Sequence, residues 1–225
     1  AEADFVVKEL LRRAREDGVP LDDMAVLYRT NALSRLVEDR LVAANVPYRV
    51  VGALRFYERR EIKDLIAWLR LLVHPDSDQD FLRAAAAPPR GLGDKTLDDL
   101  RDRAALQNTS LHAAARALCA AGPDAPQRAA RTLGAFLDTV RDLTDLSRGI
   151  STRATLQAVM DTIDYMDYLE KAFPGDYAAR QENIGALVAA AREHDEAGAP
   201  DGLAGFLDRV SLRADTDDVR GRRGP

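Results

Sequence analysis

The chain has 225 residues, of which 46% are hydrophobic and 31% are charged, so it can bury a core while keeping a solvated surface. Its single cysteine, Cys119, excludes a disulfide bond within the chain and a cysteine-rich zinc site, and fits a reducing cytoplasm. No apolar run approaches the ~20 residues that a membrane helix needs, and no signal peptide is visible. The net charge of −5 restricts any nucleic-acid-binding surface to a local patch of Lys and Arg.

The beginning of the chain, residues 1–55, predicts a small α/β unit. An amphipathic helix is predicted over 5–16, and the apolar run 24–28 resembles a buried parallel strand. A helical stripe over 33–41 and a β-rich run over 47–52 follow. Strand, helix and strand in this order predict a right-handed βαβ unit.

After Gly52 the pattern becomes helical, and no further strand is predicted. Pro75 ends the first of these helices, and Ser77-x-x-Asp80 has the form of a capping box for the next. The helices are predicted at 62–72, 77–86, 95–105, 110–120, 126–147, 152–160, 177–196 and 202–213. The fold class is therefore mainly α, with an N-terminal α/β domain over 1–55 and a helical domain over 56–215. Residues 216–225 are polar and rich in Gly and Arg, which predicts a disordered tail.

The first candidate site is Tyr28-Arg-Thr-Asn31, at the carboxyl end of the first predicted strand. Ligands of open α/β sheets bind at such ends, where the following helix also offers free N–H groups to a phosphate. Arg29 can pair with a phosphate, and Asn31 can hydrogen-bond to phosphate, sugar or base. The alternative is that Asn31 caps the helix and Arg29 is a solvated surface charge.

The second candidate site is the segment Gly52–Asp64, in which Phe56 and Tyr57 lie among basic residues. Single-strand binding uses this combination, since rings stack on bases and cations hold the backbone. The alternative is an ordinary entry into a helix, with Phe56 in the core and local ion pairs. The basic residues are Arg49, Arg55, Arg59, Arg60 and Lys63.

The third candidate site is Arg90-Gly91-Leu92-Gly93-Asp94-Lys95-Thr96, between the helices predicted at 77–86 and 95–105. It has the form of a helix-hairpin-helix element, in which glycines let the backbone approach a phosphate and Arg90 and Lys95 add charge. Such a hairpin would hold duplex DNA by its backbone without reading sequence. The alternative is a turn in which the glycines only supply positive φ.

Other catalytic patterns are missing from the sequence. It contains no Gly-x-x-x-x-Gly-Lys-Ser/Thr phosphate loop and no Asp-Glu pair placed to hold Mg²⁺. No nucleophile elbow is present, and His74, His112 and His194 lack metal-ligand spacing. We therefore expect this chain alone to contain no catalytic residue, no metal site and no cofactor.

The three motifs, in this order, resemble superfamily 1 DNA helicases of the UvrD/PcrA/Rep group. Tyr-Arg-Thr-Asn-x-x-Ser-Arg is followed by a Phe-x-x-Arg-x-Glu-Ile-Lys-Asp stretch and by Pro-x-Arg-Gly-Leu-Gly-Asp-x-Thr. The segments around Arg180-Gln-Glu-Asn183 and Leu203-x-x-Phe206 resemble later helices of the same group. The resemblance covers residues 1–215 and is most specific over 24–97.

The resemblance implies an enzyme that moves 3′ to 5′ on single-stranded DNA using ATP and Mg²⁺ held between two RecA-like domains. Residues 1–55 would belong to the second of these, domain 2A, and residues 56–215 to the accessory domain 2B. By motif matching, Arg29 would reach the ATP γ-phosphate, Asn31 and Arg55 would touch the single strand, and Gly91–Thr96 would touch the duplex. The family's phosphate loop and its Thr-x-His-x-x-Lys-Gly motif are absent, so we expect a piece of a longer protein.

The resulting hypothesis is a DNA-binding fragment of an ATP-dependent helicase of DNA repair or replication. Its partners would be junctions of single-stranded and duplex DNA, together with repair proteins, in the bacterial cytoplasm at the nucleoid. The alternative is a protein-interaction domain whose acidic helices dock a repair partner or the motor domains of the longer protein.

Overall fold

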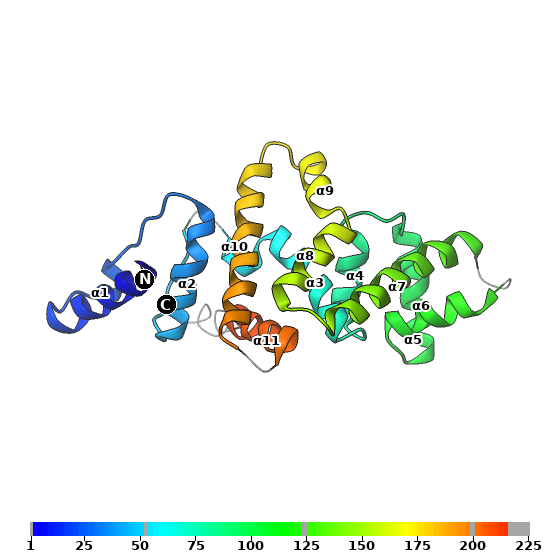
Figure 1. Cartoon of the computed structure of the whole chain (residues 1–225), viewed down its shortest axis with the longest axis horizontal. Coiled ribbons are helices and arrows are strands. Elements are labelled where there is room, and N and C mark those ends of the chain that lie inside the picture. The colour runs from blue at the N-terminus through cyan, green and yellow to red at the C-terminus, as the bar shows by residue number, and fades with distance from the viewer. Residues whose placement is uncertain (1, 52–53, 123–125, 199–200, 216–225) are drawn as a thin grey trace.

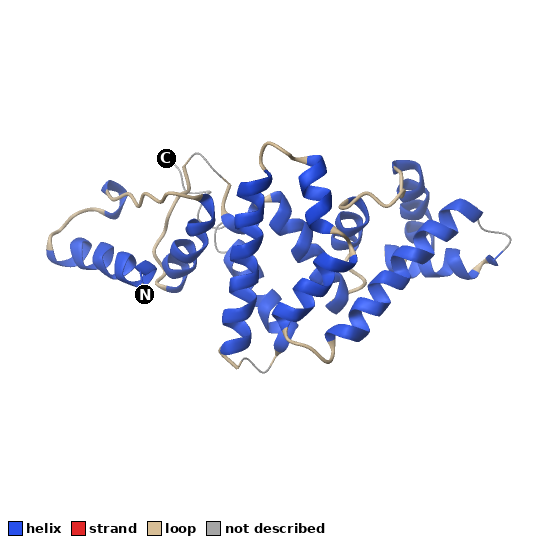
Figure 2. Ribbon diagram, turned by 45° about the horizontal axis from the view of Figure 1, so that its top comes forward, coloured by secondary structure: helices blue, strands red, loops and turns tan. Residues whose placement is uncertain are grey.

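The computed structural model describes residues 2–51, 54–122, 126–198 and 201–215. Its regular elements are helices, which follow one another in an elongated arrangement (Figures 1 and 2). Helices α1 (Glu2–Glu16) and α2 (Ser34–Ala43) lie at one end, and α5 (Asp94–Gln107), α6 (Leu111–Ala120) and the start of α7 (Gln127–Ser147) lie at the other.

The N-terminal part has a small core of its own. Helices α1 and α2 pack together around Val7, Leu41 and Val46. Short 3₁₀ turns lie at Leu21–Asp23 and Asn31–Leu33. The helices predicted over 5–16 and 33–41 are confirmed.

The strands predicted at 24–28 and 47–52 are not found in the described part of the chain. Both segments run between helices without a paired neighbour, and residue 52 lies outside the described residues. Leu27 is 95% exposed and Val51 is 79% exposed, whereas a parallel strand is normally buried on both faces. Because a strand exists only when its backbone bonds to another strand, the apolar composition of these segments was not sufficient to produce the βαβ unit.

The larger part of the molecule consists of helices packed around α3 (Arg60–Val73). A 3₁₀ turn at Phe56–Glu58 leads into α3. The remaining helices are α4 (Asp78–Ala86), α8 (Thr152–Thr162), α9 (Tyr165–Ala172), α10 (Tyr177–Glu196) and α11 (Gly202–Asp215). All eight helices predicted in this part are present, whereas α9 was missed. The predicted tail, 216–225, lies outside the described residues.

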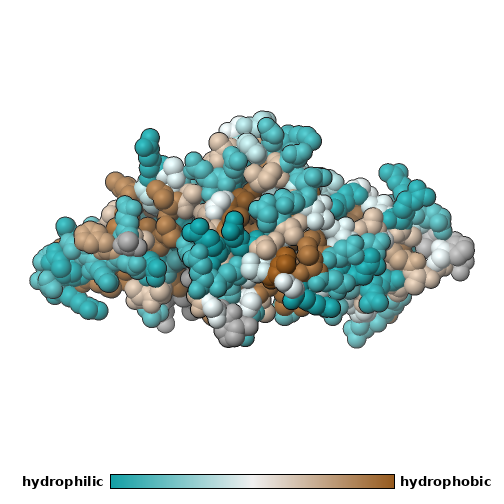
Figure 3. All heavy atoms as spheres, viewed as in Figure 1, coloured by the Kyte–Doolittle hydropathy of each residue, from teal (hydrophilic) through white to brown (hydrophobic). Residues whose placement is uncertain are grey.

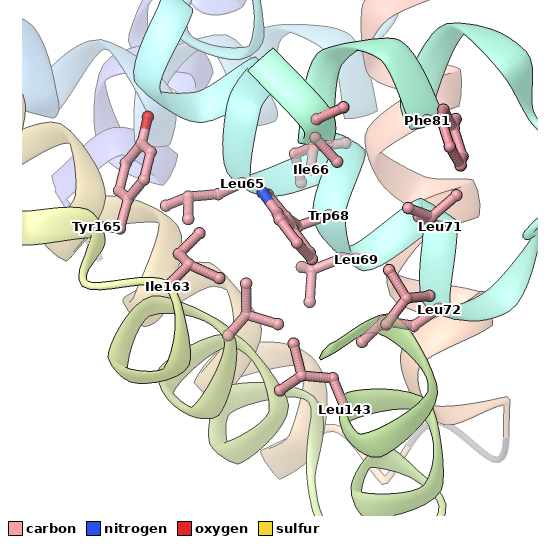
Figure 4. Packing of buried hydrophobic residues seen from close by; sticks show 14 of the residues in the cluster. Leu65, Ile66, Trp68, Leu69, Leu71, Leu72, Phe81, Leu143, Ile163 and Tyr165 are labelled. Atoms are coloured by element: carbon pink, nitrogen blue, oxygen red, sulfur yellow. The ribbon is translucent and has the colours of Figure 1, made fainter. Parts of the chain in front are cut away.

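Helix α3 forms the centre because most of its residues, including Glu61 and Asp64, are buried. Its Ile62, Leu65, Trp68 and Leu69 are fully buried. Figure 4 shows side chains of this helix converging with Leu143 of α7, among others from neighbouring helices. Helices α4, α7, α8, α10 and α11 all pack against α3, and together they bury its apolar side chains.

The start of α4 confirms the predicted N-cap at Ser77 but not the reciprocal half of the capping box, because the Ser77 N–H bonds to the His74 carbonyl. The Ser77 Oγ accepts a hydrogen bond from the Asp80 N–H at 3.4 Å, and donates one to Asp80 Oδ2 at 2.6 Å. This cap fixes where α4 begins. It therefore fixes one of the two helices that flank the Gly91–Thr96 hairpin.

Candidate nucleic-acid interface

The hairpin joins α4 to α5 as predicted, and its two glycines have different conformations. Gly91 has φ +75°, a left-handed conformation that a side chain would strain. Gly93 is the N-cap of α5, with φ −76°, and its carbonyl accepts the N–H groups of Thr96 (2.9 Å) and Leu97 (3.2 Å). Gly93 offers no side chain to the first turn of α5, so N–H groups there are left for a ligand.

A pocket of about 440 Å³ lies between the hairpin and the first turn of α7. Its charged lining side chains are Lys95, Arg103, Arg128 and Asp99, that is, three cations and one carboxylate. The other lining residues are Gly91, Leu92, Gly93, Thr96, Leu118, Pro126, Ala129 and Thr132. Four of the predicted duplex-contacting residues thus share one concave, net-positive surface: Gly91, Gly93, Lys95 and Thr96.

Arg90 is not among the residues that line this pocket. Its guanidinium lies over the Trp68 ring, 4.8 Å from the centroid. The Nε and Nη2 atoms are buried without a hydrogen-bond partner, and burial lowers the pKa of the group. The structure therefore brings Lys95, but not Arg90, to the predicted phosphate-binding surface.

The first candidate site lies near the opposite end of the molecule, before α2 (Figure 1). Arg29 and Asn31 are exposed there. Asn31 is the first residue of a 3₁₀ turn whose N-cap is Thr30, and Thr30 makes no side-chain capping bond. Asn31 thus does not occupy the N-cap position that the alternative interpretation assigned to it.

The second candidate site is divided between surface and core. Phe56 is fully buried, so it cannot stack on a base, and its alternative interpretation as a core residue is confirmed. Arg55 is half-buried, with its guanidinium 5.8 Å from the centroid of the Tyr48 ring. Arg59 is only 6% exposed, which removes it from the basic surface.

Arg59 is instead the centre of a largely buried group of polar and charged side chains that we call the polar junction. It joins α2 and the entry to α3 with α10, and consists of Ser34, Arg35, Arg59, Glu61, Arg180, Asn183 and Glu193. Arg59 donates to Asn183 Oδ1 at 2.7 Å and to Ser34 Oγ at 2.8 Å. Glu61 accepts from Asn183 Nδ2 and Arg180 Nη1, both at 2.6 Å.

Burial affects the pKa values of the arginines in this junction. It lowers the pKa of Arg59, although Glu38 and Glu61 oppose that effect. Burial also works against the charge of Arg35, but the hydrogen bond to Glu193 and the nearby Asp39 carboxylate together raise its pKa. A buried charge is tolerated only when it is paired and hydrogen-bonded, so these interactions serve the packing of α2 on α10 rather than an exposed site.

Sequence reasoning missed Arg103 and Arg128 as members of the candidate interface. Neither belongs to the Gly-x-Gly motif, and Arg128 lies 32 positions beyond Thr96 in the numbering. A basic residue in the first turn of a long helix was the one available signal. Among the described residues, no group of His, Cys, Asp or Glu could hold a metal ion, and no helix could span a membrane.

The comparison with known proteins agrees with the motif order. The family model of the UvrD-like helicase C-terminal domain matches residues 1–116. The chain is 31% identical over 218 residues to the ATP-dependent DNA helicase PcrA of Bacillus subtilis, covering 97% of this chain and 29% of that protein. It is 34% identical over 238 residues to the ATP-dependent DNA helicase UvrD1 of Mycobacterium tuberculosis, covering 97% of this chain and 30% of that protein.

A second PcrA, from Leuconostoc citreum, is 33% identical over 223 residues, covering 96% of this chain and 30% of that protein. The chain thus spans about 30% of the length of the curated relatives it matches. The family match covers more than half of the chain and includes all three motifs. This chain belongs to the UvrD-like helicase C-terminal domain family.

Proposed function

We propose that this chain is a DNA-binding part of an ATP-dependent 3′–5′ DNA helicase, and that it holds duplex DNA by its backbone. The observation that carries the proposal is the pocket in which Gly91, Gly93, Lys95 and Thr96 converge. A start of α5 without a side-chain cap, two glycines in the hairpin and an exposed Lys95 are features that phosphate recognition uses. The relatives named ATP-dependent DNA helicases support this interpretation of the pocket.

The remaining assignments follow from the motif match. Asn31 and Arg55 would contact the single strand, and Arg29 would contact the γ-phosphate of ATP bound with Mg²⁺ in the longer protein. Domain 2A would cover 1–55 and domain 2B 56–215, in a bacterial cytoplasmic enzyme that works at the nucleoid. The chain contains no phosphate-loop pattern, so ATP turnover by the pure chain would contradict this division of roles.

The test is binding of a forked oligonucleotide and of a plain duplex at several salt concentrations. Lys95→Ala should weaken both, about equally for unrelated sequences, because backbone contacts carry no sequence information. Lys171→Ala is the matched control, since Lys171 is also an exposed lysine but lies on α9, away from the pocket. If the two variants bind DNA equally well, the hairpin is only a turn between helices.

A second candidate function is docking of another protein, and it is favoured by the N-terminal part of the molecule. Leu27, Val51 and Leu54 are 95%, 79% and 60% exposed, and Figure 3 shows some brown side chains among teal ones toward this end. Exposed apolar patches mark interaction surfaces. The partner would be a repair protein or the motor domains of the longer protein. Tight binding of such a partner, together with no affinity for forked DNA, would favour this candidate over the first.

A further inference from the structure

We propose that Arg103 and Arg128 form a second wall of the duplex site, and that the pocket clamps a phosphodiester between α5 and α7. This inference rests on the proposed function, which needs only the hairpin and Lys95. It adds two residues that lie outside the hairpin motif, and it makes the start of α7 part of the DNA surface.

The first argument is that α7 reaches the hairpin itself. A Cβ added to Gly91 would lie 3.9 Å from Thr132 Cγ2, in ordinary van der Waals contact. Arg128 is one helical turn before Thr132 on α7, and both residues line the pocket. The first turn of α7 therefore faces the hairpin across the pocket.

The second argument is that the basic residues of the pocket are not paired with carboxylates in the described part of the chain. Arg103 and Arg128 are exposed, and among the described residues neither they nor Lys95 form an ion pair. By contrast, Arg101 on α5 pairs with Asp98, and Arg141 on α7 pairs with Asp138. Three cations with their charge uncompensated face one carboxylate, Asp99, in a molecule whose net charge is −5. Such a local surplus is what attracts an anionic backbone.

The third argument is that both long helices at the pocket begin without a side-chain cap. Gly93 and Pro126 are the N-caps of α5 and α7, and neither makes a side-chain capping bond. The first N–H groups of α5 have no partner in their own helix. The positive ends of two helix dipoles then add to the field of the three cations.

The volume of the pocket is large enough for a phosphodiester. A pocket of about 440 Å³ is of the size that holds a small organic ligand, so a phosphodiester with parts of its sugars can enter it. Because the recognised group is the phosphate, inorganic phosphate has the same chemistry. We assign the duplex backbone, since the same pocket contains the hairpin residues Gly91, Gly93 and Lys95 to which the proposed function assigns duplex DNA.

Arg128→Ala tests the assignment, with Arg131→Ala as the matched control. Both arginines are exposed residues near the start of α7, but only Arg128 lines the pocket. We expect Arg128→Ala to lower duplex affinity by about tenfold and to reduce the salt slope by about 0.9 for each phosphate that is no longer neutralised. Arg131→Ala should change neither quantity. Arg103→Ala should behave as Arg128→Ala does.

Asp99→Asn should change duplex affinity in the opposite direction, and a folding defect would not raise the affinity. Removing the carboxylate charge from the lining of the pocket should raise duplex affinity. If Lys95→Ala weakens duplex binding and Arg128→Ala leaves it unchanged, Arg128 is not part of the duplex site, and the proposed function still stands. No change in either variant would overturn both. If Arg128→Ala weakens only the binding of inorganic phosphate, the pocket is a free-anion site and the assignment to DNA is wrong.

Discussion

Arg35 and Glu193, 158 positions apart in the chain, form a two-point ion pair. The distances are 3.0 Å from Nη2 to Oε1 and 3.3 Å from Nη1 to Oε2. The side chain of Arg35 is only 3% exposed, whereas that of Glu193 is 51% exposed. Arg35 also pairs with Asp39 at 3.1 Å. This pair closes one edge of the polar junction and holds the N-terminal part of the molecule against α10.

Glu193→Ala is expected to lower the free energy of unfolding by about 1–3 kcal/mol, because it leaves a buried guanidinium with Asp39 as its remaining carboxylate. Glu196→Ala is the control on the same helix. Its ion pair with Arg192 is exposed at both partners, so the effect should stay below about 1 kcal/mol. Urea denaturation measures both values. Equal effects of the two substitutions would show that the polar junction contributes nothing beyond a surface ion pair.

Phe136→Ala should destabilise the protein by about 3–5 kcal/mol, since it leaves a cavity in the centre of the core. The Phe136 ring lies 5.5 Å from Trp68 and 5.1 Å from Phe81, centroid to centroid. Fluorescence of Trp68, the only tryptophan, reports the unfolding directly. Leu146→Ala on the same helix removes a side chain that is 48% exposed, and should destabilise much less. A similar effect of both would mean that the aromatic cluster is not the centre of the core.

Asp195 predicts a dependence of stability on pH. Its carboxylate accepts the N–H groups of Thr152 (3.0 Å) and Arg153 (2.9 Å), at the first turn of α8. Burial opposes the charge, but these backbone hydrogen bonds outweigh it and lower the pKa of Asp195. The folded pKa lies below the unfolded one, so the stabilisation is full well above about pH 4 and disappears as pH falls through the folded pKa.

Asp195→Asn should therefore destabilise the protein at neutral pH, and the difference from the unchanged protein should shrink below about pH 4. Unfolding curves in urea at a series of pH values measure it. Asp161→Asn serves as the control, because Asp161 is exposed and its carboxylate accepts only from Gln157 of its own helix among the hydrogen bonds described. A difference that persists undiminished to acid pH would show that the carboxylate charge is not what caps α8.

Arg29→Ala and Asn31→Ala test the motif match in a longer protein that carries the phosphate loop. An arginine that reaches the γ-phosphate is worth roughly 10³-fold or more in turnover, so Arg29→Ala should impair ATP hydrolysis by about that factor. Asn31→Ala should weaken single-strand binding about tenfold. Arg15→Ala, an exposed arginine of α1, should alter neither. If all three variants turn over ATP and bind single strands normally, Arg29 and Asn31 are ordinary surface residues.

Local patterns in the sequence were enough to determine the described helices other than α9, the cap at Ser77 and the hairpin. Helical periodicity and capping depend on neighbours within about four positions, so they can be read from the chain. The same reasoning failed at 24–28 and 47–52, because a strand needs a distant partner to bond to. It missed α9, which is only eight residues long and begins after Asp164 in a left-handed conformation.

Only the tertiary structure decided which basic residues are buried and which remain open to a ligand. Arg59 and Arg90 have the sequence pattern of surface cations, yet packing places Arg59 between Ser34 and Asn183 and Arg90 over Trp68. Arg128 carried no motif, yet the approach of α7 to the hairpin brings it into the pocket with Lys95. Residue type determines the charge, but burial and the proximity of residues far apart in sequence determine whether that charge is paired inside the protein or remains open to a ligand.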